Sequence, residues 1–338
     1  MTFGVEGGMR ISGWMIVCGA CILAVTAARA TPENRGELEL VESYPIETTL
    51  DVPDLRDAHL VWVEMIESAK KTIDIAQFYV SPKEGAAGRL EPVLGALKKA
   101  SERGVRVRLM ADAKFARKYP KPLAELDSVT GIEVRKLDLK HVTGGVLHAK
   151  YFVVDGDAFY LGSQNFDWRS LEHIQELGVW VKSRVLTNDV MKIYEADWAR
   201  AGGQSVEGTS TTTRNSESDT LSFGKKQAIV QVVATPKRLL PSGVGYELDV
   251  MRQALKGARK SVQLQLLSYA VKGYDGTMWR EIDELLRAAA ERGVSVEIIL
   301  ADWSKKAPKV EAIQSLAACD NITVKFVTIP AWSGGHIP

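Results

Sequence analysis

The chain of 338 residues is 46% hydrophobic and 25% charged, values that exclude a disordered protein and fit one or two globular domains. Of its 43 basic and 42 acidic residues, Arg10, Arg29 and Glu6 fall within residues 1–30, which leaves 41 of each sign in the remainder. The body therefore has no overall basic field to attract a polyanion, although this does not exclude a local basic groove.

The first thirty residues have the pattern of an export signal. Arg10 precedes an apolar run over residues 11–28, and residues 28–30 (Ala-Arg-Ala) form a cleavage site of the A-x-A type. This pattern predicts a signal peptide over residues 1–30 and an exported protein, either periplasmic or secreted. Two alternatives use the same segment: an uncleaved signal-anchor that associates with a membrane, and lipid attachment at Cys21.

The next hundred residues alternate between helical and extended patterns. Apolar periodicity predicts helices over 54–70 and 88–103 and strands over 73–80, 105–110 and 132–136. The alternation of helices and strands predicts an α/β fold with layers of helices on a sheet.

A cluster of polar residues follows these elements. His148 and Lys150 are two residues apart on a predicted strand, so their side chains leave the same face. A hairpin through residues 156–157 brings Ser163 and Asn165 back beside them. A nucleophile, a cation and hydrogen-bond donors then surround one position, an arrangement suited to a phosphoryl group.

The chain contains an internal repeat. Three blocks of the first half recur at an offset of 189 or 190 residues, with residues 69–73, 100–105 and 131–134 matching 258–262, 289–294 and 321–324. Helices and strands are predicted again at 246–259, 261–269, 278–292, 294–300 and 309–327. The sequence thus predicts a duplicated unit.

The predicted organisation separates the two copies by a linker. Residues 45–200 form the first unit and residues 227–338 form the second. Residues 201–226 are rich in Gly, Ser and Thr and have few large apolar side chains, which predicts a flexible linker. Adding the repeat offset to His148 and Lys150 places their equivalents at about 337–340, so the second copy stops before its own motif.

The segment from His148 to Asn165 reads H-x-K-x4-D-x6-G-S-x-N, the HKD motif, and with the repeat it resembles the phospholipase D superfamily. The continuation at 166–170 and 176–179 is most similar to the branch of membrane-anchored or secreted phospholipase D-like exonucleases. The resemblance covers about residues 50–338. It implies a duplicated phospholipase D-like α/β unit, with mixed sheets flanked by helices and an incomplete second copy.

The resemblance also implies roles for the motif residues. His148 is the nucleophile that forms a phosphohistidine, or else the acid that protonates the leaving group. Lys150 and Asn165 bind phosphoryl oxygens, Ser163 supports the phosphate, and Glu176 orients the imidazole. The other two motif positions, Asp155 and Gly162, are structural; Asp155 lies five residues beyond Lys150 and so faces the other side of the strand.

The expected activity is hydrolysis of a phosphodiester without cofactor or metal, since no cluster of carboxylates or histidines has metal-ligand spacing. The substrate is a phospholipid headgroup or single-stranded nucleic acid, and the resemblance favours the latter. Because the family builds one site from two motifs, three interpretations remain: a fragment of a two-motif enzyme with little activity of its own, a homodimer that shares one site, and a phosphate-binding scaffold without turnover.

Overall fold

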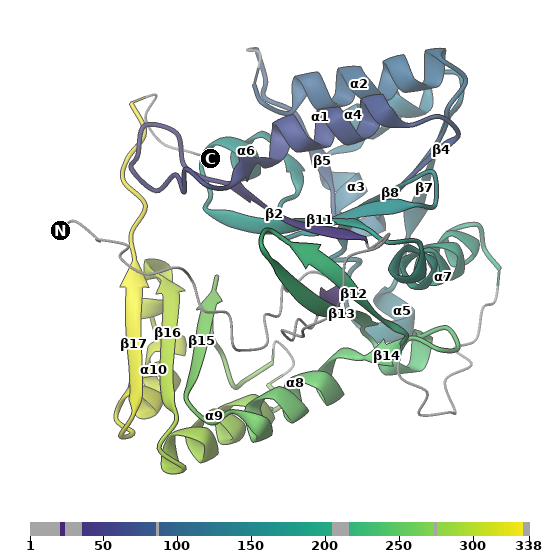
Figure 1. The fold of residues 1–338 in the computed structure, drawn as a ribbon. Helices are drawn as coiled ribbons and strands as arrows, with labels where there is room; N and C mark the ends of the chain where they lie inside the picture. Colours follow the sequence, from purple (N-terminus) through teal and green to yellow (C-terminus); the bar gives the residue numbers. More distant parts are fainter. Residues whose placement is uncertain (1–20, 24–35, 86–87, 205–215, 274–275, 334–338) are drawn as a thin grey trace. The chain divides into compact units, whose positions relative to one another are not determined.

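The computed structural model describes residues 21–23, 36–85, 88–204, 216–273 and 276–333 (Figure 1). Contacts divide the chain into two compact units, the first of residues 1–247 with 332–338 and the second of residues 248–331. The predicted signal over residues 1–30 lies outside the described residues except for Cys21–Leu23, a short strand. Among the described helices, none has the length and apolar character to cross a bilayer.

The first unit is built on a large mixed sheet. Its strands are β1 (Cys21–Leu23), β2 (Glu37–Ser43), β3 (Arg56–Asp57), β4 (Thr72–Gln77), β6 (Arg106–Asp112), β7 (Ile132–Leu137), β8 (Lys150–Val154), β9 (Ala158–Gly162), β11 (Glu176–Lys182), β12 (Ser218–Phe223), β13 (Lys226–Ala234) and β14 (Gly245–Tyr246). In the described part of the unit they run β1-β13-β12-β2-β11-β9-β8-β4-β6-β7, with β3 and β14 beside β2 and β13. The strands β4, β6 and β7 are parallel, whereas β4, β8, β9 and β11 pair antiparallel.

Helices cover both faces of this sheet (Figure 1). Their bounds are α1 (Ala58–Ser68), α2 (Glu91–Glu102), α3 (Ala113–Lys118), α4 (Pro120–Asp127), α5 (Lys140–Thr143), α6 (Trp168–Glu172) and α7 (Arg184–Ala201). The apolar stripes of α1 and α2 pack on one face, where the fully buried Trp62 meets Phe152, Tyr160 and Phe166 at ring-centroid distances of 5.0–6.3 Å. Helix α7 packs on the other face through residues such as Tyr194.

The hairpin between β8 and β9 is fixed by Asp155, which has a φ of 54° at the turn. Its carboxylate accepts hydrogen bonds from the backbone N–H groups of Lys70, Lys71 and Thr72 at 2.7–2.9 Å. Burial raises the pKa of Asp155, but the three N–H donors outweigh it and hold the pKa below its usual value. These contacts join the hairpin to the start of β4.

We expect Asp155→Ala to lower the free energy of unfolding by about 1–3 kcal/mol, because three backbone donors lose a charged acceptor. The folded-state pKa is depressed, so this stabilisation is present above pH 3.8 and is lost as the pH falls through the folded value. Urea unfolding at pH 7 and at pH 3 measures both effects. The neighbouring variant Asp157→Ala removes an exposed ion pair and should change stability by less than about 0.5 kcal/mol; equal losses from the two variants would contradict the assignment.

The predicted linker over residues 201–226 differs from the structure in its second half. Residues 218–223 form β12, which pairs with β13 through a turn in which Gly224 has a φ of 53°. Leu221 is buried in the core beneath α7. The strand was not predicted because its few apolar residues alternate with Ser and Thr, the residues that indicated a linker. The described contacts also assign β13 to the first unit, so the boundary lies at residue 247 and not at residue 227.

The second unit repeats the parallel part of the first. Its elements are α8 (Glu247–Gly257), β15 (Ser261–Leu266), α9 (Glu281–Glu291), β16 (Ser295–Ala301), α10 (Lys309–Ala317) and β17 (Ile322–Val327). The strands pair in the parallel order β15-β16-β17, as β4, β6 and β7 do. Helices α9 and α10 share an apolar core with one face of this sheet. The mixed α/β fold with a repeated unit is therefore confirmed.

Candidate active site

The motif residues meet at one edge of four adjacent antiparallel strands. Lys150 begins β8 opposite Gln77, the last residue of β4, while Gly162 ends β9 opposite Gly178 of β11. Glu176 begins β11. Side chains alternate between the two faces of a sheet. These positions lie an even number of residues from side chains of the same strands that enter the core under α1 and α2. The edge thus presents Lys150, Gln77 and Glu176 on the same face of the sheet.

His148 lies just before β8 and is exposed, whereas Lys150 is buried. The Lys150 Nζ donates a hydrogen bond to the His148 carbonyl oxygen at 2.8 Å, and the imidazole packs against the Phe78 ring at a centroid distance of 4.6 Å. Desolvation, aided by the Lys150 ammonium, lowers the pKa of His148 to about 4. The direction of this shift favours the neutral form of the imidazole.

Ser163 and Asn165 return beside this pair after β9. The Ser163 hydroxyl accepts a hydrogen bond from the Leu177 N–H at 3.3 Å, which ties the turn to β11. The Asn165 N–H donates to the Ser170 hydroxyl at 3.2 Å. In the described part of the chain the buried Asn165 Oδ1 has no hydrogen-bond partner.

Gly162 allows the turn to approach its neighbours closely. A Cβ at this position would collide with the side chain of Gln164 and would stand 2.8 Å from the Tyr160 hydroxyl and 3.0 Å from the Gly178 Cα. Any larger residue would push β9 away from β11 and displace the turn that carries Asn165. This packing agrees with the structural role that the motif implied for Gly162. Asp155, at the far end of β8, is about 16 Å from Lys150 by strand rise.

Glu176 is the most perturbed carboxyl of the site. Burial raises its pKa to about 8, against the lowering effects of hydrogen bonding from Ser170 and of the Lys150 ammonium. The Oε2 atom is buried and has no hydrogen-bond partner among the described residues. No hydrogen bond joins Glu176 to His148 in the same part of the structure, so the imidazole contact implied by the resemblance is not seen.

The raised pKa of Glu176 gives a pH-dependent stability. Between pH 4.5 and about 8 the folded chain holds a proton that the unfolded chain releases, so the free energy of unfolding falls as the pH rises, by up to about 4 kcal/mol. Glu176→Gln should remove this slope and be the more stable protein at pH 8. Denaturant unfolding at pH 5, 6.5 and 8 tests the prediction, with the exposed Glu125→Gln as the control. Parallel curves for wild type and Glu176→Gln would refute it.

Several residues that hold the site were not singled out by sequence reasoning. Asp167 is buried, accepts a hydrogen bond from the Tyr79 hydroxyl at 2.6 Å, and caps α6 through the Arg169 N–H at 3.0 Å. Helix α6 in turn carries Ser170 to Asn165. In the sequence, the segment 166–170 was identified only by its resemblance to a family branch. The supporting role of its residues could not be predicted, because these contacts join residues from separate strands.

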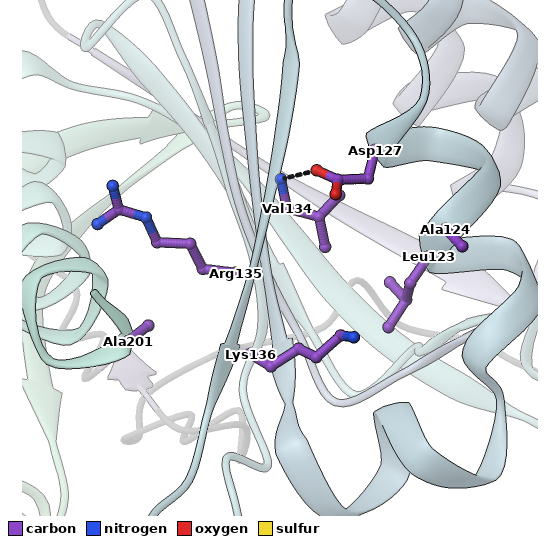
Figure 2. A pocket seen from close by; sticks show the side chains of 7 residues that line it. All are labelled: Leu123, Ala124, Asp127, Val134, Arg135, Lys136 and Ala201. Carbon is purple, nitrogen blue, oxygen red and sulfur yellow. Dashed lines mark hydrogen bonds between the residues drawn. The ribbon is translucent and has the colours of Figure 1, made fainter. Parts of the chain in front are cut away.

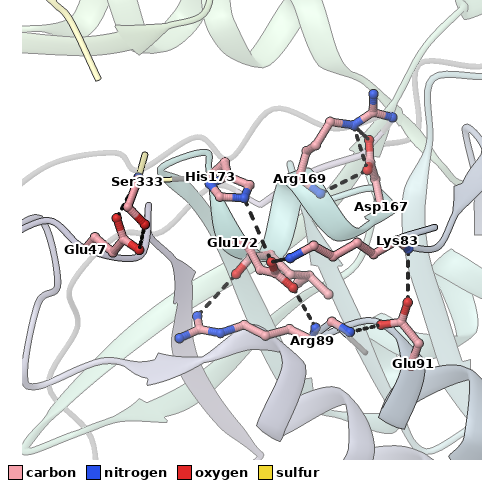
Figure 3. A network of polar contacts seen from close by, with 11 residues as sticks. Glu47, Lys83, Arg89, Glu91, Asp167, Arg169, Glu172, His173 and Ser333 are labelled. Atoms are coloured by element: carbon pink, nitrogen blue, oxygen red, sulfur yellow. Dashed lines mark hydrogen bonds and ion pairs between the residues drawn. The ribbon is translucent and has the colours of Figure 1, made fainter. Parts of the chain in front are cut away.

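A buried ion network holds the other end of α6 (Figure 3). The Glu172 carboxylate accepts hydrogen bonds from the Lys83 Nζ at 3.1 Å and from the Arg89 N–H at 2.8 Å. The Lys83 ammonium also lies 5.1 Å from the ring centroid of Trp168 and 5.0 Å from that of Trp332. Both ends of the helix that carries Ser170 are therefore fixed.

Two further observations concern other kinds of site. A cavity of about 340 Å³ lies along β7 and contains none of the motif residues (Figure 2). It is lined by Leu123, Ala124, Asp127, Val134, Arg135, Lys136 and Ala201. In the described part of the chain no group of three or more His, Cys, Asp or Glu side chains is placed to hold a metal ion.

Comparison with known proteins identifies the family of the chain. The fold is that of the phospholipase D superfamily, and a family model described as "PLD3/4, PLD-like domain" matches residues 57–330. The chain belongs to this family.

The chain is similar to two curated relatives and to one solved structure. It is 33% identical over 326 residues to a 5'-3' exonuclease PLD3 of Bos taurus, with 87% of this chain and 66% of that protein covered. It is 27% identical to phospholipase D Z of Dictyostelium discoideum, with 87% and 74% covered. The phosphatidylserine synthase of Haemophilus influenzae shares the fold, with a TM-score of 0.51, 14% identity, and coverage of 79% of this chain and 62% of that one. The chain thus spans about two thirds of the length of the PLD3 relative.

Proposed function

We propose that this protein is a phosphodiesterase that hydrolyses single-stranded nucleic acid, with His148 as the group that attacks phosphorus. The observation that carries the proposal is that His148, Lys150 and Asn165 lie at one sheet edge. The lowered pKa of His148 favours the neutral imidazole, and Lys150 beside it is buried. The curated PLD3 relatives, named as 5'-3' exonucleases, favour nucleic acid as the substrate class.

The reaction proceeds by two displacements. The His148 imidazole forms a nitrogen–phosphorus bond while the phosphorus–oxygen bond to the leaving nucleoside breaks, and that oxygen takes a proton from an acid. Water then attacks phosphorus, which releases the phosphate and restores the imidazole. Lys150 and Asn165 hold the non-bridging oxygens and stabilise the charge that develops on them. We assign the acid to no residue of the described part of the chain.

A lipid diester is the second candidate substrate, because a relative at 27% identity is named phospholipase D Z. Incubation of the protein with a single-stranded oligonucleotide and, separately, with phosphatidylcholine vesicles distinguishes the two. We expect nucleotide release and no headgroup release. Headgroup release alone would replace our assignment with the lipid one.

The arrangement of the site among chains is a separate part of the proposal. A dimer that shares one site requires association and activity to rise together with protein concentration, whereas a phosphate-binding scaffold binds the oligonucleotide and never cleaves it. Specific activity measured across a dilution series, with mass measured by light scattering, separates these cases. We further propose that residues 1–30 export the protein, which N-terminal sequencing of material from its source tests.

A further inference from the structure

A row of aromatic rings begins at the candidate nucleophile. The His148 imidazole contacts Phe78, whose centroid lies 3.9 Å from that of Phe115. Phe115 is stacked on Tyr79 at 5.6 Å, and Tyr79 is stacked on Tyr119 at 5.2 Å. Phe78 is buried, whereas Phe115 and Tyr119 are only half-buried, so the row opens to solvent away from His148.

The row is fixed relative to the motif by backbone contacts. Asp112 is the N-cap of α3, where its carboxylate accepts a hydrogen bond from the Phe115 N–H at 3.0 Å. The other oxygen of the same carboxylate accepts from the Leu147 N–H at 2.8 Å, one residue before His148. The helix that carries Phe115 is therefore tied to the loop that carries His148.

The same helix supplies positive charge. Lys114, Arg117 and Lys118 of α3 are exposed, and the Lys118 ammonium lies 5.1 Å from the ring centroid of Tyr119. The nearby acid Asp167 is buried and engaged by Arg169 and by the Tyr79 hydroxyl, so it does not oppose this charge at the surface. The whole chain has a net charge of only +1. The positive charge of α3 beside the half-buried rings is therefore a local feature and not part of an overall basic field.

We propose that Phe115, Tyr119 and the basic residues of α3 form the path along which single-stranded nucleic acid approaches His148. Bases stack on aromatic faces without regard to sequence, while lysine and arginine accompany the phosphates. A zwitterionic lipid headgroup has no net charge for α3 to attract and no planar ring to stack. The inference rests on the proposed function and assigns its substrate class to named residues.

Binding of a fluorescent single-stranded oligothymidylate, measured by anisotropy on the full chain with His148→Ala to prevent cleavage, tests the path. Tyr119→Leu and Phe115→Leu should each weaken binding by about 5- to 100-fold, the range for loss of one stacked base. Tyr119→Phe keeps the ring and should bind as the parent does. Trp279→Leu changes an exposed aromatic residue of the second unit and is the matched control.

The charge contribution has its own measurement. Replacing Lys114, Arg117 and Lys118 together by Ala should reduce the slope of log K against log salt concentration by about 2, since each phosphate contact of a single strand contributes roughly 0.7. Thermal unfolding of every variant identifies loss of fold, and Phe115→Leu still tests the stacking contribution if Tyr119→Leu does not fold.

An error in the path and an error in the proposed function give different experimental results. If Tyr119→Leu, Phe115→Leu and the triple variant all bind the oligonucleotide as the parent does, the path is wrong, even while wild-type cleavage upholds the proposed function. If the wild type cleaves no oligonucleotide but binding still depends on these residues, the path stands and the proposed function is wrong. Binding of phosphatidylcholine vesicles through the same residues, without oligonucleotide binding, would overturn the path.

Discussion

His148→Ala should reduce the rate of oligonucleotide hydrolysis by at least about 10³-fold, because the variant lacks the group that forms the covalent bond to phosphorus. His148 is an exposed residue whose ring packs edge-on against Phe78. Stability should therefore change by less than about 1 kcal/mol. The measurement is single-turnover cleavage of a labelled oligonucleotide, together with thermal unfolding.

His141→Ala is the matched control for this experiment. His141 is also exposed and lies seven residues earlier, on the short helix α5. Its replacement should leave the rate within about twofold of wild type. Cleavage that survives His148→Ala at the wild-type rate would show that His148 is not the nucleophile, and equal losses in both variants would point to general damage to this loop.

Arg108→Ala should lower the free energy of unfolding by about 3–5 kcal/mol, the largest stability effect we expect from a single substitution. Arg108 is buried on the α7 face of β6, where its Nε donates to the Asp74 carboxylate at 2.6 Å. Its other nitrogens donate to Glu195 at 2.6 and 3.1 Å. Without the guanidinium, Asp74 is left as a buried and uncompensated charge.

The reason for this loss can be isolated with two further proteins. The double variant Asp74→Leu/Arg108→Met removes both buried charges and should recover most of the stability lost by Arg108→Ala. Arg106→Ala, at an exposed position of the same strand, should cost less than about 0.5 kcal/mol. Equilibrium urea unfolding provides the comparison, and a double variant no more stable than Arg108→Ala would exclude the buried charge as the cause.

The parallel part of both units could be predicted from the sequence, since its signals are local. The strands predicted at 105–110 and 132–136 correspond to β6 and β7, and the repeat correctly predicted that helices and strands alternate again in the second unit. Apolar periodicity reports directly on burial in such strands, which carry continuous or alternating apolar residues. The spacing of the motif likewise predicted His148 as the candidate nucleophile, and that role stays a prediction.

The remaining features depend on contacts between distant residues. The predicted strand over residues 73–80 ends at Gln77, so that Phe78 and Tyr79 lie beyond the strand, and the Phe78 ring packs against the His148 imidazole. Nothing in their local sequence separates them from strand residues. The raised pKa of Glu176 also comes from burial between separate strands, which no spacing along the chain reveals.

Mass spectrometry of the protein quenched at alkaline pH during cleavage of a single-stranded oligonucleotide tests the central claim most directly. Phosphohistidine survives such a quench, so we predict a phosphoryl or nucleotidyl adduct on the peptide that contains His148. The adduct should form at the rate of cleavage and be absent from His148→Ala. An adduct on another residue that persists in His148→Ala, or cleavage without any adduct, would contradict the assignment of His148 as the nucleophile.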